Sequence, residues 1–169
     1  MLREVQATDA LGICHIYNPY ILQTEITFEE EPLQETEIND RIQTIQRSGL
    51  PWLVTIEENT GELQGYAYAS PWKARSAYRY TVETSIYLAP AWQGCGLGQT
   101  LYQTLIQQLK TQGIHSVIGI LALPNPASIR LHEKLGFQPV GQIQDAGFKF
   151  NRWIDVGYWQ LMLDQGLIL

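Results

Sequence analysis

Apolar residues recur at the spacing of a helix in four segments of the chain, with strand-like runs between them. The four segments extend from about Asp9 to Leu22, from about Leu33 to Gly49, from Leu97 to Gly113 and from about Ala127 to Leu135. In the third segment, Leu101, Leu105 and Leu109 form one stripe, as in a helix that packs against a sheet. The pattern therefore predicts four helices.

Local signals refine the first two helices. Thr8 is placed to cap the first, in which Leu11, Ile16 and Tyr20 lie near one face. In the second helix, Ile38, Ile42 and Ile45 recur at helical spacing. Glu35 and Glu37 suit its positive N-terminal end, and Gly49 can end it. The acidic cluster from Glu29 to Glu31 precedes this helix, and we expect it to be solvated surface.

Strand-like runs occupy much of the remaining chain. One lies near Leu2 to Gln6, and three more have the sequences PWLVTIEE, LQGYAYASPW and YTVETSIYL. Turn residues from Asn59 to Gly61 separate the first two of these three, which predicts an antiparallel meander. The continuous apolar run from Val117 to Leu123 is typical of a strand buried on both faces. A strand pair around Val140 to Phe148 and Trp153 to Leu163 completes the series.

The order of elements sets the fold class. Strand, glycine-rich loop, helix and buried strand predict a right-handed crossover between two parallel strands. Together with the meander and the last strand pair, this gives an α/β protein of the α+β kind, with a mixed sheet. The sequence contains no internal repeat, low-complexity run or linker, so we expect residues 1–169 to form a single domain.

Composition excludes several classes of protein. The net charge of −6 has the wrong sign for a nucleic-acid surface. Cys14 and Cys95 are two cysteines far apart, so neither a disulfide framework nor a C-x-x-C metal or redox motif is present, and we expect no metal. The first residues lack an apolar signal core, and the longest apolar run is too short to span a bilayer. We therefore expect a cytoplasmic protein that binds neither nucleic acid nor membranes.

Three glycines at alternate positions mark the segment WQGCGLGQ, from Trp92 to Gln99, directly before the third predicted helix. A dinucleotide fingerprint requires a glycine where Gln99 stands, and the Gly-Lys-Ser/Thr end of a triphosphate loop is absent. Because the loop ends where a helix begins, backbone N–H groups and the helix dipole converge on one point. This favours a phosphate site; a tight connection whose glycines serve only backbone geometry is the alternative.

The wider pattern resembles a known family. Gln93-x-x-Gly96-x-Gly98, followed one strand later by NPASIRLHEKLGF (Asn125 to Phe137), is similar to the acetyl-CoA signature of the GNAT N-acyltransferase superfamily. The segments PWLV, YAYASPWKARSAY, TVETSIYL, LPNPAS, LHEKLGF and AGFKFNRWIDVGYWQL resemble its phosphinothricin N-acetyltransferase branch, over about residues 2 to 163.

The resemblance implies the GNAT fold: a mixed, mostly antiparallel sheet of about seven strands, helices on both faces, and a parallel pair flanking the acetyl-CoA site. It also implies acetyl-CoA as co-substrate, a small-molecule amine as acceptor and a homodimer. The family's coenzyme contacts match Ser85, Ile86, Tyr87, Gln93, Gly94, Cys95, Gly96, Leu97, Gly98, Gln99, Asn125 and Ser128. Gln93, where relatives often have arginine, adds hydrogen bonds but no charge.

Acetyl transfer from a thioester needs an amine without its proton, and hence a base. Period-2 geometry places Glu83, Ser85 and Tyr87 on one strand face and Val82, Thr84, Ile86 and Leu88 on the other. A carboxylate in mid-strand is costly to bury, which favours a functional role for Glu83. The other interpretation is an exposed or ion-paired glutamate without a catalytic role. The family's catalytic glutamate matches Glu83, so the resemblance implies that Glu83 is the base.

The resemblance also implies acid or base assistance by His132, either as a relay for the amine proton or as the acid that protonates the coenzyme sulfur. The sequence alone is equally compatible with a surface or core histidine. We expect direct attack in a ternary complex. Cys95, the candidate nucleophile for a ping-pong reaction, occupies a variable position of the loop, where we expect its backbone to matter more.

Lys73 and Arg75 stand near Trp72 and Tyr78 in the sequence and are suited to bind a carboxylate. Without the family resemblance, the two cations would be interpreted as solvated surface charges. The resemblance implies substrate contacts at Phe28, Lys73, Arg75, Tyr78 and Tyr87. Four other aromatic residues, Tyr66, Tyr68, Trp153 and Trp159, are interpreted as core or dimer contacts.

Three functions are compatible with this sequence. The first is an acetyl-CoA-dependent N-acetyltransferase that acts on the α-amine of a small amino acid or an analogue such as phosphinothricin, methionine sulfoximine or methionine sulfone. The second is an acetyltransferase of protein N-termini, which the pair of Lys73 and Arg75 disfavours because a peptide masks its α-carboxyl group. The third is a non-catalytic acetyl-CoA sensor, which the presence of Glu83 and His132 disfavours.

Overall fold

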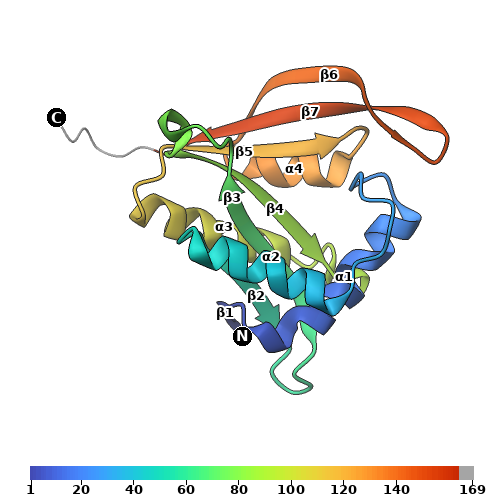
Figure 1. Ribbon diagram of the computed structural model, residues 1–169, viewed down its shortest axis with the longest axis vertical. Helices are drawn as coiled ribbons and strands as arrows, with labels where there is room; N and C mark the ends of the chain where they lie inside the picture. The colour runs from blue at the N-terminus through green and yellow to red at the C-terminus, as the bar shows by residue number, and fades with distance from the viewer. Residues whose placement is uncertain (164–169) are drawn as a thin grey trace.

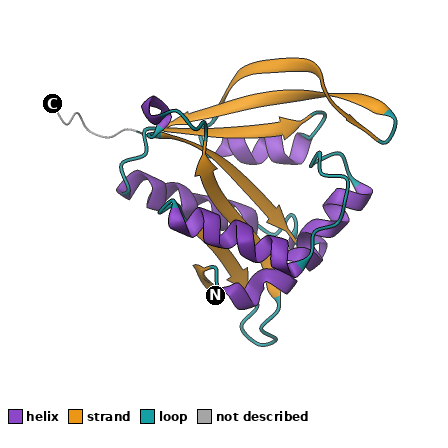
Figure 2. Ribbon diagram, viewed as in Figure 1, coloured by secondary structure: helices purple, strands orange, loops and turns teal. Residues whose placement is uncertain are grey.

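The computed structural model describes residues 1–163, which form one mixed sheet with helices on both faces (Figures 1 and 2). Within these residues the seven strands have the order β1-β2-β3-β4-β5-β7-β6. They are β1 (Leu2–Glu4), β2 (Trp52–Ile56), β3 (Leu63–Pro71), β4 (Thr81–Leu88), β5 (Ser116–Ala122), β6 (Gln138–Lys149) and β7 (Arg152–Met162). The helices are α1 (Ala10–Gln23), α2 (Glu35–Arg47), α3 (Leu97–Thr111) and α4 (Pro126–Lys134). The predicted fold class is confirmed; the predicted domain of 1–169 includes residues 164–169, which lie outside the described residues.

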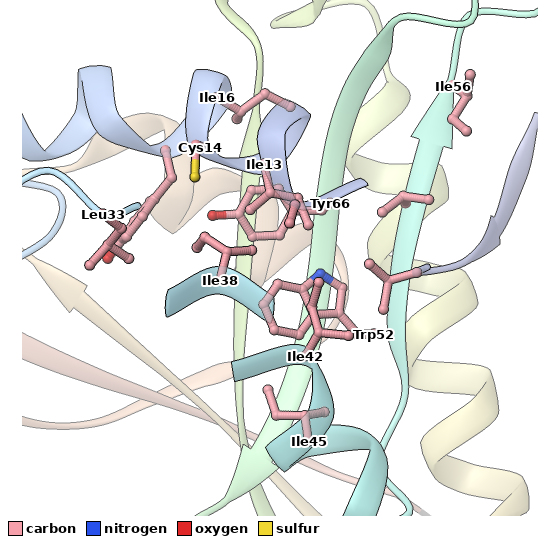
Figure 3. Packing of buried hydrophobic residues seen from close by; sticks show 14 of the residues in the cluster. Ile13, Cys14, Ile16, Leu33, Ile38, Ile42, Ile45, Trp52, Ile56 and Tyr66 are labelled. Atoms are coloured by element: carbon pink, nitrogen blue, oxygen red, sulfur yellow. The ribbon is translucent and has the colours of Figure 1, made fainter. Parts of the chain in front are cut away.

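Helices α1 and α2 cover one face of β2 and β3, and their apolar residues interlock with the strands (Figure 3). Ile38, Ile42 and Ile45 are all buried, as the helical spacing predicts. Trp52 and Tyr66 complete this layer, with ring centroids 5.8 Å apart in a stacked arrangement. This half of the molecule is therefore built on an aromatic sheet face rather than an aliphatic one.

Helices α3 and α4 cover the opposite face. The predicted stripe of α3 is confirmed, since Leu101, Leu105 and Leu109 are fully buried against the sheet. β5 is buried along most of its length, as expected of an interior parallel strand. The meander is also confirmed: β2, β3 and β4 pair antiparallel, and β4 pairs with β5 in parallel.

The parallel pair separates halfway along its strands. Pairing runs from Thr81 opposite Ser116 to Thr84 opposite Gly119 and then ends, although β4 continues to Leu88. The last part of β4 therefore has β3 on one side and no strand on the other. Backbone groups at such an edge are available to a ligand.

Two predictions for the first helix are wrong. Residues Ala7–Asp9 form a short 3-10 turn, and Asp9, not Thr8, accepts the backbone hydrogen bond from Gln6 at 2.7 Å. Both oxygens of Asp9 also bind the guanidinium of Arg3, at 2.7 Å each, and this pair fixes the turn. Leu11 is 51% exposed because the buried face of α1 runs along other residues, Ala10, Ile13, Cys14, Ile16, Tyr17 and Ile21.

The acidic cluster is not uniformly solvated. Glu29 accepts two hydrogen bonds from Arg41, at 2.7 and 3.0 Å, and one from the hydroxyl of Tyr17 at 3.1 Å. Burial opposes ionisation of this carboxyl group, but the hydrogen bonds and charge of Arg41, the hydrogen bond from Tyr17 and the charge of Lys149 together outweigh it and lower its pKa. The prediction is therefore wrong for Glu29, which anchors the connection between α1 and α2 to the second helix.

A clamp joins that same connection to the β6–β7 hairpin. The ammonium group of Lys149, which is 2% exposed, donates to the carbonyl of Thr27 at 2.7 Å. The ring of Phe28 lies directly against Gly147, where a side chain would collide with it. An ion pair between Arg152 and Glu25, at 2.9 Å, adds a third link. We call these three contacts the loop clamp.

The described part of the chain contains no helix that is both long and apolar enough to cross a membrane.

Candidate active site

A cavity of about 520 Å³ opens where β4 and β5 separate. Its walls come from the end of β4, the glycine loop with the start of α3, and the start of α4. The predicted coenzyme residues Ile86, Tyr87, Gln93, Gly94, Gly96, Gly98, Gln99, Asn125 and Ser128 line it. Ser85, Cys95 and Leu97, also predicted, are not among its lining residues.

The glycine loop has the geometry of an anion site. Gly94 and Gly96 have φ angles of 74° and 88°, which disfavour any residue with a side chain, and a Cβ at either would meet nothing within 4 Å. Gly96 caps α3, whose first N–H groups have no partner inside the helix. A Cβ at Gly98 would lie 3.1 Å from the side chain of Leu88, so this glycine lets α3 approach β4. The loop therefore fits the pyrophosphate of a coenzyme.

Sequence reasoning missed several residues of this cavity. Tyr20, Ile26, Leu88, Ala127, Arg130, Leu131 and Lys134 also line it. Tyr20 donates to the carbonyl of Leu88 at 2.6 Å and accepts from Gln93 at 2.9 Å, which ties α1 to the loop. Arg130 and Lys134 are four residues apart on α4, a spacing that puts two cations on one helix face. That spacing was the signal available in the sequence.

Glu83 is half-buried on the face of β4 that is turned toward α1 and α2. It lies opposite Ser70 on β3, as Ser85 lies opposite Tyr68 and Tyr87 opposite Tyr66, so the predicted faces of this strand are confirmed. Burial raises the pKa of the Glu83 carboxyl group, and the charge of Lys73 acts in the opposite direction. A carboxylate with a raised pKa, three residues before Ile86, the first residue of β4 that lines the cavity, is suited to accept a proton.

The predicted substrate residues are spread over several parts of the structure, unlike the predicted coenzyme residues. Lys73 acts on Glu83 electrostatically, and its ammonium group also lies 4.5 Å from the ring centroid of Trp72. Arg75 and Tyr78 are exposed on the same β3–β4 connection, outside the cavity. Phe28, 40% exposed, belongs to the loop clamp. Tyr87 lines the cavity.

Of the four aromatic residues interpreted as core or dimer contacts, Tyr66 and Trp159 are buried and Tyr68 packs against Trp52 with ring centroids 4.5 Å apart. Trp153 is 62% exposed, so it is not a core residue. It follows a turn at the tip of the β6–β7 hairpin and contacts Phe148.

His132 is buried and hydrogen-bonded at both ring nitrogens. Nδ1 lies 2.8 Å from the carbonyl oxygen of Ser128, which can only accept, so Nδ1 carries the proton. In the neutral imidazole, Nε2 therefore accepts from the hydroxyl of Tyr102, 3.1 Å away. The phenol also lies 2.6 Å from the hydroxyl of Thr84, which is itself 3.4 Å from the carbonyl oxygen of Ile118. A chain of hydrogen bonds therefore links His132 to β4.

Burial lowers the pKa of the His132 imidazole and so favours its neutral form, while the hydrogen bond to Ser128 acts in the opposite direction. The ring packs against β5 at Gly119, where a Cβ would lie 2.5 Å from Nε2. Because Thr84 is next to Glu83 on the strand, His132 and Glu83 approach β4 from opposite faces.

Cys95 is exposed, and its thiol donates to the carbonyl of Trp92 at 3.0 Å. The described residues contain no group of three or more His, Cys, Asp or Glu side chains placed to hold a metal ion.

Replacing Lys73 by Met should move the acidic limb of the pH profile to higher pH. The ammonium group favours the ionised form of Glu83, so its loss raises the pKa of Glu83 and the carboxylate is lost at a higher pH. The measurement is kcat/KM for an amine acceptor against pH. Arg79→Met is the matched control, because that guanidinium lies 4.5 Å from the ring centroid of Tyr80 and does not act on Glu83. A limb that stays in place or moves to lower pH would contradict the prediction.

Comparison with known proteins places this geometry in context. The model of the acetyltransferase (GNAT) domain matches residues 2–157. The chain is 42% identical to the phosphinothricin N-acetyltransferase of Streptomyces viridochromogenes, over 94% of this chain and 85% of that protein. It is 37% identical to the L-methionine sulfoximine/L-methionine sulfone acetyltransferase of Pseudomonas aeruginosa, over 96% and 94%. The crystal structure of a phosphinothricin acetyltransferase from Sinorhizobium meliloti in complex with acetyl-CoA superimposes with a TM-score of 0.95 at 38% identity, covering 100% of this chain and 91% of that one.

Proposed function

The chain belongs to the GNAT acetyltransferase family, and on that premise we propose that it transfers the acetyl group of acetyl-CoA to the α-amine of a small amino acid or amino-acid analogue. Phosphinothricin, methionine sulfoximine and methionine sulfone are the first acceptors to test, because the relatives' names specify them. The observation that carries the proposal is the position of Glu83, a half-buried carboxylate on β4, three residues before Ile86, where that strand begins to line the cavity.

Each part of the cavity has a role in this reaction. Acetyl-CoA supplies a thioester whose carbonyl carbon is open to attack. The N–H groups at the start of α3 and the loop glycines hold the pyrophosphate, and Arg130 and Lys134 add positive charge beside them. The free edge of β4 from Ser85 to Leu88 offers main-chain groups that orient the pantetheine arm, with Asn125 across the cavity. The donor is thereby fixed relative to β4.

Glu83 removes the proton from the bound ammonium group, so that the amine attacks the thioester carbonyl carbon as the neutral nucleophile in a ternary complex. The new N–C bond forms as the C–S bond breaks, the nitrogen loses its second proton, and coenzyme A leaves as a thiolate that takes up a proton. The raised pKa of Glu83 brings its basicity closer to that of the amine. We propose that His132 assists from the other face. Its Nδ1–H is held by Ser128, so a proton that reaches or leaves this residue must pass through Nε2 and hence the hydroxyl of Tyr102.

A free amino acid should be acetylated at least about tenfold more efficiently than its amide, because Lys73 and Arg75 provide charged partners for the carboxylate. The measurement is thiol release from acetyl-CoA with each acceptor of a matched pair. In an Arg75→Met variant the discrimination should shrink. An amide acetylated as well as the free acid would instead favour the second candidate function, acetylation of protein N-termini.

Absence of turnover with every amine, together with tight binding of acetyl-CoA, would favour the third candidate, a coenzyme sensor.

Two further properties belong to the proposal, a cytoplasmic location and a homodimer. Sedimentation equilibrium is the test of the homodimer. The exposed apolar residues on β6, Val140 and Ile143, and Trp153 on β7 support a dimer contact on the outer hairpin.

A further inference from the structure

A second cavity, of about 370 Å³, lies between α2 and the sheet, on the face that carries Glu83. Ser70 stands at its edge and is the direct cross-strand partner of Glu83. Side chains opposite each other on one face of an antiparallel pair have Cβ atoms about 4.5–5.5 Å apart. The cavity thus begins next to the carboxylate that we propose as the base.

Three stacked aromatic rings form the floor of this cavity. Trp52 and Tyr68 have ring centroids 4.5 Å apart, and Tyr66 lies 5.8 Å from Trp52 and 6.4 Å from Tyr68. Ile38 and Ile45 of α2 form the opposite wall (Figure 3). A flat aromatic floor under an aliphatic wall favours an apolar group of extended shape.

The charges at the mouth disfavour an anion. Arg41 and Asp40 both line the cavity, but the guanidinium of Arg41 is bound at two nitrogens by Glu29. Asp40 adds a negative charge to the lining, while the positive charge of Arg41 is already paired with Glu29. No cation on the lining remains free of an acidic partner to bind a phosphinate or carboxylate. An uncharged group enters such a site more readily than an anionic one.

We propose that this cavity takes the side chain of the acceptor and selects amino acids with long, uncharged side chains. The inference rests on the proposed function. It gives each substituent of an α-amino acid a place: the amine at Glu83, the carboxylate toward Lys73, and the side chain past Ser70 and Tyr68 over the aromatic floor. Of the acceptors named for the relatives, the uncharged methionine sulfone fits this cavity and the anionic phosphinothricin does not.

The wild-type protein is tested with three acceptors, L-alanine, L-norleucine and phosphinothricin. Each methylene buried in an apolar site improves binding about fourfold. We therefore expect kcat/KM for norleucine to exceed that for alanine by at least about tenfold, and to exceed that for phosphinothricin as well. Equal values for alanine and norleucine, or a preference for phosphinothricin, would overturn the proposal.

A cavity-filling variant tests whether the side chain of the acceptor occupies this cavity. Thr44→Phe places a ring at the mouth of the cavity from an exposed position of α2, and Gln43→Phe places the same ring one residue away, outside the cavity. In Thr44→Phe, kcat/KM for norleucine should fall by at least about tenfold while that for alanine is retained. Gln43→Phe should leave both unchanged. A loss shared equally by the two acceptors, or no loss at all, would contradict the proposal.

Binding is measured separately from turnover, by titration calorimetry of norleucine and alanine into protein saturated with coenzyme A. Tighter binding of norleucine than of alanine in the wild type, lost in Thr44→Phe, would support the proposed side-chain cavity. If in addition no acceptor were acetylated, the proposed function would be wrong and the cavity proposal would stand. Equal binding of both acceptors would remove the cavity proposal and leave acetyl transfer untouched.

Discussion

Glu83→Gln is expected to lower kcat by at least about a hundredfold at neutral pH while acetyl-CoA binds as in the wild type. Glutamine has nearly the shape of glutamate but cannot take a proton, so the bound amine stays charged and loses its nucleophilic electron pair. The coenzyme cavity does not include Glu83 among its walls, which is why donor binding should survive. The measurement combines steady-state thiol release with calorimetric titration of acetyl-CoA.

Glu4→Gln is the control for this experiment, because Glu4 is an exposed strand glutamate on β1, an edge strand that β2 and β3 separate from β4. It should leave kcat unaltered. The remaining activity of Glu83→Gln should also rise steeply with pH, since free amine then comes only from solution. Wild-type turnover in Glu83→Gln would remove this residue from the mechanism.

Gly119→Ala is expected to destabilise the protein by about 1–3 kcal/mol and to impair acetyl transfer. The added Cβ would lie 2.5 Å from Nε2 and 2.6 Å from Cδ2 of His132. That ring cannot swing aside without breaking its bonds to Ser128 and Tyr102. Urea unfolding measures the first effect and steady-state kinetics the second.

Gly141→Ala is the matched control, since a Cβ there would meet no atom within 4 Å. Combining Gly119→Ala with His132→Ala removes the colliding ring, so the two stability losses should be less than additive. An unchanged urea midpoint for Gly119→Ala, or strict additivity in the double variant, would show that the ring is not held in place as described.

The parts of the fold that depend on local pattern were predictable. The stripe of α3, the glycine loop before it and the alternation of faces along β4 require only residues close in sequence. The same local signal predicted an anion site at the loop, of which Gln93, Gly94, Gly96, Gly98 and Gln99 line the larger cavity. Local periodicity was less informative in α1, whose apolar residues are not confined to one face, and this is why Leu11 was misplaced.

The parts that depend on distant partners were not predictable. The ring of His132 bonds to Tyr102, 30 residues away, and the pKa of Glu29 is lowered by Arg41, which stands on α2. A residue's own neighbours in the sequence do not reveal such pairings. The resemblance to a family singled out Glu83 and His132 as candidates, but it did not indicate that they stand on opposite faces of the strand.

The loop clamp joins residues that lie 122 positions apart in the sequence, Thr27 and Lys149. Closing a loop of this length costs more conformational entropy than closing a short one, so we expect the clamp to form after local contacts. During synthesis, the connection between α1 and α2, which carries Phe28, therefore stays without this anchor until the last hairpin has left the ribosome.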